Sequence, residues 1–414
     1  MQDHQEWKRC LLGDVITLQR GYDLPERERQ YGNVPIVSSS GVTGHHNSAK
    51  VKGPGVVTGR YGTLGEVFYI EENFWPLNTT LFVRDFKGNS PLFISYFLRT
   101  LNLAHQNGAG AVPGVNRNAL HLLPVRVPSL SIQRTIATIL SAYDDLIENN
   151  TRRIAILEEM AQMLYQEWFV KFRFPGHEQA TMVESEMGMI PEGWEFLKLG
   201  DVIELAYGKA LKADTRLPGN IPVYGSAGIV GYHQEKLVDG PGIIVGRKGN
   251  VGSVFWANSD FYPIDTVFYV RTELSLYYIY YNLRQQHFIN NDAAVPGLSR
   301  HQAYSLPFIR PSDTLLRSFE DFVKPVFFLK TNLIQRGSIL RRTRDRLLPK
   351  LISGEIDVSS WVEGGGEAAA LELAGSVAGG ADVYERGRQV RRVAESGPVA
   401  PIDKEGMGWE SLWE

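Results

Sequence analysis

The chain has 414 residues, which is enough for two to three domains that each bury a core. Hydrophobic residues make up 43% and charged residues 21%, as in soluble globular proteins, and the single cysteine, Cys10, excludes a disulfide framework and a cysteine-based zinc site. The net charge of −3 is unevenly divided: residues 354–414 hold 5 basic and 12 acidic side chains, leaving 38 basic and 34 acidic ones in residues 1–353. This balance is compatible with a nucleic-acid partner and equally with ordinary surface charge.

The N-terminus, MQDHQEWKRC, is polar and lacks the pattern of a signal peptide. No apolar run approaches the ~20 residues that a membrane span needs. Together with the lone cysteine, these features predict a cytoplasmic protein that does not enter a membrane.

Residues 1–130 are predicted to form a first globular domain. After Trp7 and an LGDVI turn, short β-rich runs follow at the spacing of an all-β meander or barrel, separated by glycine and proline: VPIV, GVVTG, GEVFYI and TTLFVR. A helical segment (91–102), a VPG turn and an apolar LPVRVP strand complete the domain. The pattern predicts an α+β fold with a twisted antiparallel sheet.

Residues 131–174 are predicted to form one long helix, because the stretch from Gln133 contains no glycine and no proline before Pro175. Its apolar residues alternate at steps of four and three, with Asn150 filling one gap, which is the 3.5-residue period of a helix that pairs lengthwise with another. These positions are Ile136, Leu140, Tyr143, Ile147, Ile154, Leu157, Ala161, Leu164 and Trp168. The polar stretch 175–190 has no period and is expected to be a linker.

The rest of the chain repeats the first part. Trp7 recurs as Trp194, LGDVI recurs unchanged, and GPGVVTGRYGTLGEVF recurs as GPGIIVGRKGNVGSVF, all at an offset of 187 residues. Later blocks recur at an offset of 183, so that LPVRVP matches LPFIRP. A colinear series of this length is not accidental, and residues 191–313 are predicted to form a second copy of the domain.

The offset of 183 continues into a second long helix, expected over residues 314–353 with its stripe from Leu315 to Ile352. Pro325 either kinks this helix or marks its first turn. Two helices of this length satisfy their apolar stripes by pairing with each other as an antiparallel coiled coil; the alternative is that each packs on its own domain. Stripe positions are Phe319, Phe322, Val326, Leu329, Leu333, Leu340 and Leu347. The Gly/Ala/acid-rich residues 354–414 are expected to form a flexible tail.

Motifs for catalysis are missing from the sequence. The turns GRYGTLG and GRKGNVG lack the Lys-Ser/Thr of a nucleotide-binding loop, and neither HExxH, paired cysteines, a G-x-S-x-G elbow nor an amino-methyltransferase signature is present. The pattern therefore predicts a protein without an active site. Arg60 and Arg247 recur at the same place in the two turns, either to tie down their own loop or to contact phosphate.

A duplicated domain on a helical spacer suits the binding of two DNA half-sites. Residues 38–52 and 225–238 differ most between the copies, and polar side chains there would face base edges, although drifting loops would differ in the same way. The candidate DNA-binding residues are Ser38, Ser39, Ser40, His45, His46, Lys50, Arg60, Tyr61, Tyr224, Ser226, Tyr232, His233, Arg247 and Lys248. The histidines are too few and too poorly partnered for a metal site.

Residues 1 to about 357 resemble the specificity subunit of type I restriction-modification systems. The resemblance lies in the paired LGDVI openings, the GPGIIVGRKGNVGSVF block, IPEGWE after the first helix, LEEMAQMLYQEWFVKFRF within it and RDRLLPKLISGEID at the end of the second. It implies two target recognition domains, each reading one half of a bipartite DNA target, and two helices that form an antiparallel coiled coil. The tail after Asp357 is not part of the pattern.

The resemblance also implies partners: double-stranded DNA, two methyltransferase subunits and restriction subunits. Adenine methylation and ATP-dependent cleavage, with S-adenosylmethionine, ATP and Mg, would belong to those partners, and this chain would bind no cofactor. Two other interpretations remain open: a self-contained DNA methyltransferase or nuclease, and a duplicated coiled-coil adaptor that does not read DNA.

Overall fold

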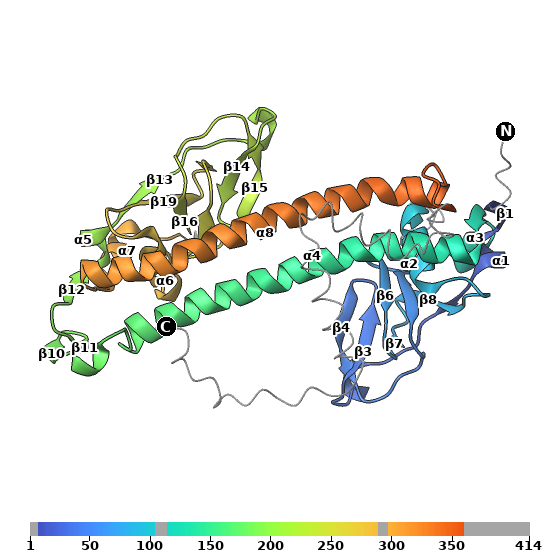
Figure 1. Ribbon diagram of the computed structural model, residues 1–414, viewed down its shortest axis with the longest axis horizontal. Coiled ribbons are helices and arrows are strands. Elements are labelled where there is room, and N and C mark those ends of the chain that lie inside the picture. The colour runs from blue at the N-terminus through green and yellow to red at the C-terminus, as the bar shows by residue number, and fades with distance from the viewer. Residues whose placement is uncertain (1–6, 104–113, 289–296, 360–414) are drawn as a thin grey trace. The chain divides into compact units, whose positions relative to one another are not determined.

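The computed structural model describes residues 7–103, 114–288 and 297–359 (Figure 1). The chain divides into two compact units. Unit 1 contains the residues up to 149 and those from 336 onward, and unit 2 contains residues 150–335. Each unit therefore consists of one globular domain and one segment of each long helix.

The globular domain of unit 1 is α+β, as predicted. Its helix α2 begins at Pro91, where the side chain of Ser90 accepts a hydrogen bond from the Phe93 N–H and proline occupies the first helical position. The elements are β1 (Trp7–Leu11), α1 (Leu12–Val15), β2 (Thr17–Arg20), β3 (Val34–Ser38), β4 (Gly41–His46), β5 (Gly55–Gly59), β6 (Val67–Ile70), β7 (Trp75–Pro76), β8 (Thr80–Asp85), α2 (Pro91–Thr100), α3 (Arg117–His121) and β9 (Pro124–Pro128).

Three small sheets make up this domain. An antiparallel sheet has the order β2-β8-β5-β6, a second sheet has the order β4-β3-β7, and β1 pairs with β9. The predicted antiparallel arrangement holds except for β7, a two-residue strand that pairs with β3 in parallel. The central strand β5 is buried along its whole length, so the core lies on both of its faces.

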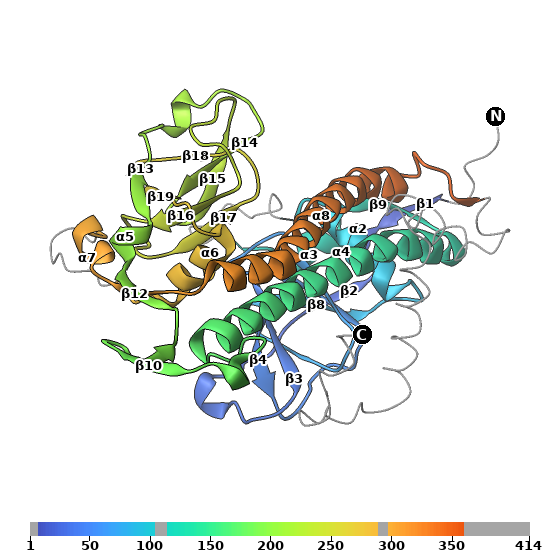
Figure 2. The ribbon, with the colours of Figure 1, turned by 60° about the vertical axis from the view of Figure 1, so that its left-hand side comes forward.

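Unit 2 repeats this topology strand for strand. Its strands β13 to β19 are labelled in Figure 2. The sheets have the orders β13-β19-β16-β17, β15-β14-β18 and β12-β20. The elements are β12 (Glu195–Lys198), α5 (Leu199–Val202), β13 (Glu204–Tyr207), β14 (Ile221–Gly225), β15 (Gly228–His233), β16 (Gly242–Gly246), β17 (Val254–Ala257), β18 (Tyr262–Pro263), β19 (Val267–Arg271), α6 (Leu276–Gln285), α7 (Arg300–Tyr304) and β20 (Pro307–Arg310).

The segment expected to be a linker is partly ordered as a hairpin. Strands β10 (Met182–Ser185) and β11 (Gly188–Pro191) pair antiparallel across a tight turn. Ser185 Oγ donates to the carbonyl of Gly188 at 2.7 Å, which closes the turn. Alternation of polar and apolar residues over four positions is too short to stand out in the sequence, so this hairpin was not predicted.

The two long helices are α4 (Leu130–Tyr165) and α8 (Asp313–Ser353), and they run antiparallel within each unit. In unit 1 Asp144 of α4 pairs with Arg344 of α8. In unit 2 Glu158 of α4 lies 3.1 Å from the ammonium group of Lys330 of α8. Within unit 2, Tyr165 lies later in α4 than Glu158 and contacts Phe319, which lies earlier in α8 than Lys330, so the two helices run in opposite directions there.

Each helix segment also packs on its globular domain, so the two packing arrangements weighed from the sequence coexist. In unit 1 the core cluster joins Ile136 and Leu140 of α4 to Leu340 of α8 and to α2 and the sheet. In unit 2 it joins Trp168 of α4 to Phe319 of α8 and to α6 and the sheet. The predicted stripe of α4 is buried at its two ends and half-buried between them.

Part of the predicted stripe of α8 was wrong. Phe322 and Leu329 are 49% and 38% exposed, although the Phe322 ring still contacts Trp168 of α4 with centroids 6.1 Å apart. Val323 and Phe327, which were not predicted, are buried at 1% and 4%. The buried face is rotated because this part of α8 packs against aromatic side chains of its own domain, including Trp256, whose ring centroid lies 4.7 Å from that of Phe327. A strict 3.5-residue period describes only contacts with another helix.

The predicted helix ends also need correction. α4 is followed by a π-helical turn over Gln166–Val170, so the helical structure ends before Phe174. This wider turn allows two consecutive aromatic residues, Trp168 and Phe169, to be buried at 5% each. α8 begins at Asp313 and continues through Pro325, which therefore does not lie in its first turn.

Buried tyrosines in unit 2 predict a loss of stability in alkali. Burial raises the pKa of Tyr165, Tyr278 and Tyr281 well above the usual range. The unfolded chain then loses these protons first, so their contribution is complete below pH ~10 and is lost above it, by about 1.4 kcal/mol per pH unit for each hydroxyl. Urea unfolding between about pH 9 and 11 measures the slope, which Tyr278→Phe should make shallower. A free energy of unfolding that stays constant over this range would contradict the prediction.

No helix among the described residues is both long enough and apolar enough to cross a membrane.

Candidate nucleic-acid interface

In unit 1 the structure brings together two of the turns that the sequence singled out. The β3–β4 turn is closed by Ser38, whose Oγ accepts the Ser40 N–H at 3.1 Å. Ser39 lies against the turn that follows β5: a Cβ atom added at Gly62 would stand 3.0 Å from Ser39 Oγ. Gly62 has a φ of 81°, a conformation that favours glycine. The GRYG segment, residues 59–62, is thus a tight turn, called the arginine turn below. It lies beside the β3–β4 turn, called the serine turn below.

Unit 2 builds the same pair of turns. Ser253 Oγ donates to the carbonyl of Ser226 at 2.8 Å, which ties the β16–β17 turn to the β14–β15 turn. A Cβ atom at Gly249 would lie 3.0 Å from Ser226 Oγ, the distance found at Gly62 in unit 1. The two units therefore present equivalent polar surfaces built from equivalent turns.

The duplicated arginine begins the second turn in each unit. The backbone N–H of Arg60 donates to the carbonyl of Thr79 at 2.8 Å, and its guanidinium lies 4.4 Å from the ring centroid of Tyr61. The backbone N–H of Arg247 donates to the carbonyl of Thr266 at 2.9 Å. Backbone position is shared, but the side chains differ in their contacts.

In unit 2 the guanidinium of Arg247 lies beside an exposed aromatic ring. Its Cζ is 4.8 Å from the ring centroid of Tyr207, and Arg300 Cζ is 4.5 Å from the same centroid. Tyr207 is 47% exposed. Lys248, next in the chain, is exposed as well. Cations and an aromatic face on one surface are a combination that binds nucleic acid.

Two of the three candidate histidines, His46 and His233, are structural. His46 and His233 are each 6% exposed. His46 Nδ1 accepts the backbone N–H of Gln30 at 3.0 Å, and His233 Nδ1 accepts that of Leu217 at 3.0 Å. Each histidine thus holds the preceding loop against its strand, and the duplication has copied this role. These contacts favour anchoring of the loop over contact with DNA.

Replacing His233 by alanine is expected to reduce the free energy of unfolding by about 1–3 kcal/mol, because the Leu217 N–H loses its acceptor. His233→Asn offers an amide oxygen in a similar place and should recover part of the loss. Urea unfolding of both variants tests this, with Gln234→Ala, an exposed neighbour, as the control. Equal stability of the His233→Ala and control variants would contradict the anchoring role.

The remaining candidates are divided between surface and interior. His45 and Lys50 are exposed, and Tyr232 is 56% exposed. Tyr224 is only 6% exposed, and burial raises the pKa of its hydroxyl to about 12. Its side chain is committed to the core beside Phe261, with ring centroids 5.9 Å apart. Tyr224 therefore has little surface to offer a ligand.

A family model described as the type I restriction modification DNA specificity domain matches residues 4–159 and 191–312, which together are more than half of the chain. The chain belongs to this family. The two matched stretches correspond to the two copies found in the sequence. The residues between them lie outside the match, and they include the β10–β11 hairpin except for Pro191, its last residue.

Relatives of this specificity-domain protein carry matching names. It is 24% identical over 298 residues to the type I restriction enzyme MjaIX specificity subunit of Methanocaldococcus jannaschii, covering 64% of this chain and 69% of that protein. It is 32% identical over 121 residues to the MjaVIII specificity subunit of the same organism, covering 29% of this chain and 28% of that protein. The type I system S subunit from M. genitalium has the same fold, with a TM-score of 0.61 at 17% identity over 85% of this chain and 98% of that one.

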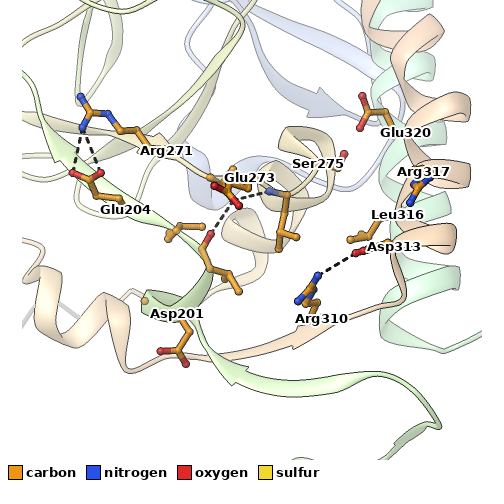
Figure 3. Close-up of a pocket in the computed structure, with 15 residues that line it drawn as sticks. Asp201, Glu204, Arg271, Glu273, Ser275, Arg310, Asp313, Leu316, Arg317 and Glu320 are labelled. Carbon is orange, nitrogen blue, oxygen red and sulfur yellow. Dashed lines mark hydrogen bonds and ion pairs between the residues drawn. The ribbon is translucent and has the colours of Figure 1, made fainter.

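A pocket of about 840 Å³ lies in unit 2 of the specificity-domain protein (Figure 3). Two ion pairs lie along its wall: Arg271 lies 3.4 Å from Glu204, and Arg310 lies 3.2 Å from Asp313. Among the described residues no group of three or more histidine, cysteine or acidic side chains is placed to hold a metal ion.

Part of the basic surface of this specificity-domain protein was not predicted from the sequence. Tyr207 and Arg300 meet Arg247, and Arg300 corresponds to Arg117 in unit 1. The signal was available, since VPGVNR and VPGLSR both end in arginine at the offset of 183. Tyr207 could not be found in this way, because the equivalent residue in the first copy is Arg20. Only the fold brings Tyr207 close to Arg247.

Proposed function

We propose that this chain is the DNA sequence-specificity subunit of a type I restriction-modification complex, in which each globular domain reads one half of a bipartite target. The observation that supports this most strongly is that each unit builds the same polar surface from the same two turns. The serine turn and the arginine turn meet in both units, at Ser39 and Gly62 and at Ser226 and Gly249.

Differences between the two surfaces suit an asymmetric target. Their frames are alike, but the exposed side chains are not: the β4 strand carries His45 where β15 carries Tyr232, and Tyr61 stands where unit 2 has Lys248. Side chains with different donors, acceptors and apolar faces select different base edges in the major groove. Two domains of one fold would thus recognise two different half-sequences.

The long helices serve as spacer and docking platform in this proposal. Both helices are shared by the two units, and they would fix the nonspecific gap between the half-sites. On α4 three apolar side chains, Ile156, Met160 and Met163, are 56%, 51% and 48% exposed, at the spacing of one helix face. An exposed apolar stripe supports the docking of a protein partner, here the methyltransferase subunits, with restriction subunits joining the assembly.

Chemistry is assigned to the partners. Adenine methylation with S-adenosylmethionine, and cleavage with ATP and Mg, would occur on the methyltransferase and restriction subunits, while this chain selects the site. The absence of catalytic motifs from the sequence supports this division. The helix-paired architecture without DNA reading, as in an adaptor, has no specific observation in its favour.

DNA binding by the chain assembled with its methyltransferase subunits tests the proposal. The complex should bind a duplex that carries both half-sites, lose that binding when either half-site is changed, and weaken as salt is raised. Binding that does not depend on sequence would favour the adaptor. Methylation of DNA by the purified chain alone would overturn the assignment of catalysis to the partners.

A further inference from the structure

Arg247 and Arg300 of unit 2 are held beside one another by the fold. Arg247 follows β16 and Arg300 begins α7, and the Leu298 N–H donates to the Arg247 carbonyl at 2.8 Å, which joins the two segments. Arg247 Nη1 donates to the carbonyl of Asp265 at 3.0 Å, and Arg300 Nη1 lies 3.4 Å from the carbonyl of Leu205. A guanidinium has five N–H donors, so both side chains are oriented and still have donors for a ligand.

The positive charges of this pair are not neutralised within the described part of the chain. No carboxylate there forms an ion pair with either arginine, whereas Arg271 and Arg310 of the same unit pair with Glu204 and Asp313. Both guanidiniums lie over the ring of Tyr207. Two cations fixed on a surface without counter-charges form a site for an anion.

Unit 1 carries cations at the same two places. Arg60 follows β5 and Arg117 begins α3, and the Val115 N–H donates to the Arg60 carbonyl at 3.0 Å, as in unit 2. The contacts of the two side chains differ, however. Arg60 lies over Tyr61, and the position of Tyr207 is occupied by Arg20. The side-chain contacts that anchor the arginines to their own loops are therefore not common to both units. What both units share is a pair of arginines at equivalent positions.

We infer that Arg60 with Arg117, and Arg247 with Arg300, are equivalent phosphate contacts that hold the DNA backbone at each half-site regardless of its sequence. This inference rests on the proposed function. If the two domains read different half-sequences, residues that read bases should differ between them, whereas residues that contact phosphates can be the same. The arginine pairs are the same in both units, and the surrounding side chains are not.

The test measures DNA affinity against salt for the full chain in complex with its methyltransferase subunits. Two fluorescein-labelled duplexes are used, one with the mapped target and one with the same bases scrambled. In the double variant Arg247→Gln/Arg300→Gln, affinity should fall by the same factor for both duplexes. The slope of log K against log salt should become shallower by about 0.9 for each lost contact, or about 2 for the pair. The double variant Arg60→Gln/Arg117→Gln should lose the same affinity for both duplexes and show the same reduction in slope.

Two further variants separate charge from folding. Arg271→Gln/Arg310→Gln removes two paired arginines from the same unit and should leave the salt slope unchanged. Arg247→Lys/Arg300→Lys keeps the charge and should restore most of the slope lost in the glutamine variant. A lysine variant that binds as weakly as the glutamine variant would indicate a structural role and overturn the inference.

The remaining outcomes test the phosphate contacts separately from the proposed function. If the wild-type complex prefers its target but the glutamine variants keep the wild-type salt slope, the phosphate contacts are refuted and the proposed function stands. If those variants lose the preference for the target, the arginines read bases, which also refutes the inference. A wild-type complex that binds both duplexes equally would overturn the proposed function and this inference with it.

Discussion

Replacing Phe319 by alanine is expected to lower the free energy of unfolding of unit 2 by about 3–5 kcal/mol. Phe319 is fully buried at the contact of α8 with the end of α4. Its ring centroid lies 5.0 Å from that of Phe169, 6.1 Å from that of Trp168 and 6.2 Å from that of Tyr165. The substitution removes the ring around which these side chains pack and leaves a cavity that they cannot fill without moving.

Urea unfolding followed by tryptophan fluorescence measures this loss, since Trp168 belongs to the same cluster. The matched control is Phe328→Ala on the same helix. Phe328 is 70% exposed, so its substitution should change the free energy of unfolding by less than about 0.5 kcal/mol. Similar losses at the two positions would show that α8 does not bury the face described.

Replacing Asp144 by alanine is expected to destabilise unit 1 by about 3 kcal/mol. The Asp144 carboxylate accepts the hydroxyl of Tyr96 at 2.6 Å and pairs with Arg344 of α8. Tyr96 is 2% exposed and the Arg344 side chain 23% exposed, so both would lose a partner where water reaches them poorly. This one carboxylate therefore ties α2, α4 and α8 together.

Asp144→Asn provides the comparison. The amide keeps an oxygen that accepts the Tyr96 hydroxyl but loses the negative charge opposite Arg344, so a smaller loss of about 1–2 kcal/mol is expected. Chemical denaturation of both variants gives the difference. An alanine variant as stable as the wild type would mean that the helices of unit 1 are held by their apolar contacts alone.

Local signals in the sequence were sufficient for the repeat and for the strands. Glycine and proline bound each β-rich run, and β5 and β16 begin and end at the predicted residues 55–59 and 242–246. The lengthwise pairing of the two helices followed from the period of the α4 stripe together with the repeat, which supplied the partner helix. Such features depend on residues that are close in the chain, which is why they can be predicted from it.

Contacts between distant segments were the part that could not be predicted. The buried face of α8 turns toward Phe327 because aromatic residues of β17 and α6 lie there. The burial of His46, Tyr224 and His233 depends on loops folding over them, so their polar groups looked available in the sequence. The basic surface around Tyr207 joins three segments, and no local pattern links them.

The central claim is that each domain reads one half of the target, and mapping of methylated positions after a domain exchange tests it most directly. Residues 1–130 are replaced by the first domain of a specificity subunit with a different target, and the chain is expressed with its methyltransferase subunits. Long-read sequencing of the host genome then gives the methylated sequence. One half-sequence should change and the other should stay as it was. A change in both halves, or in neither, would contradict the account.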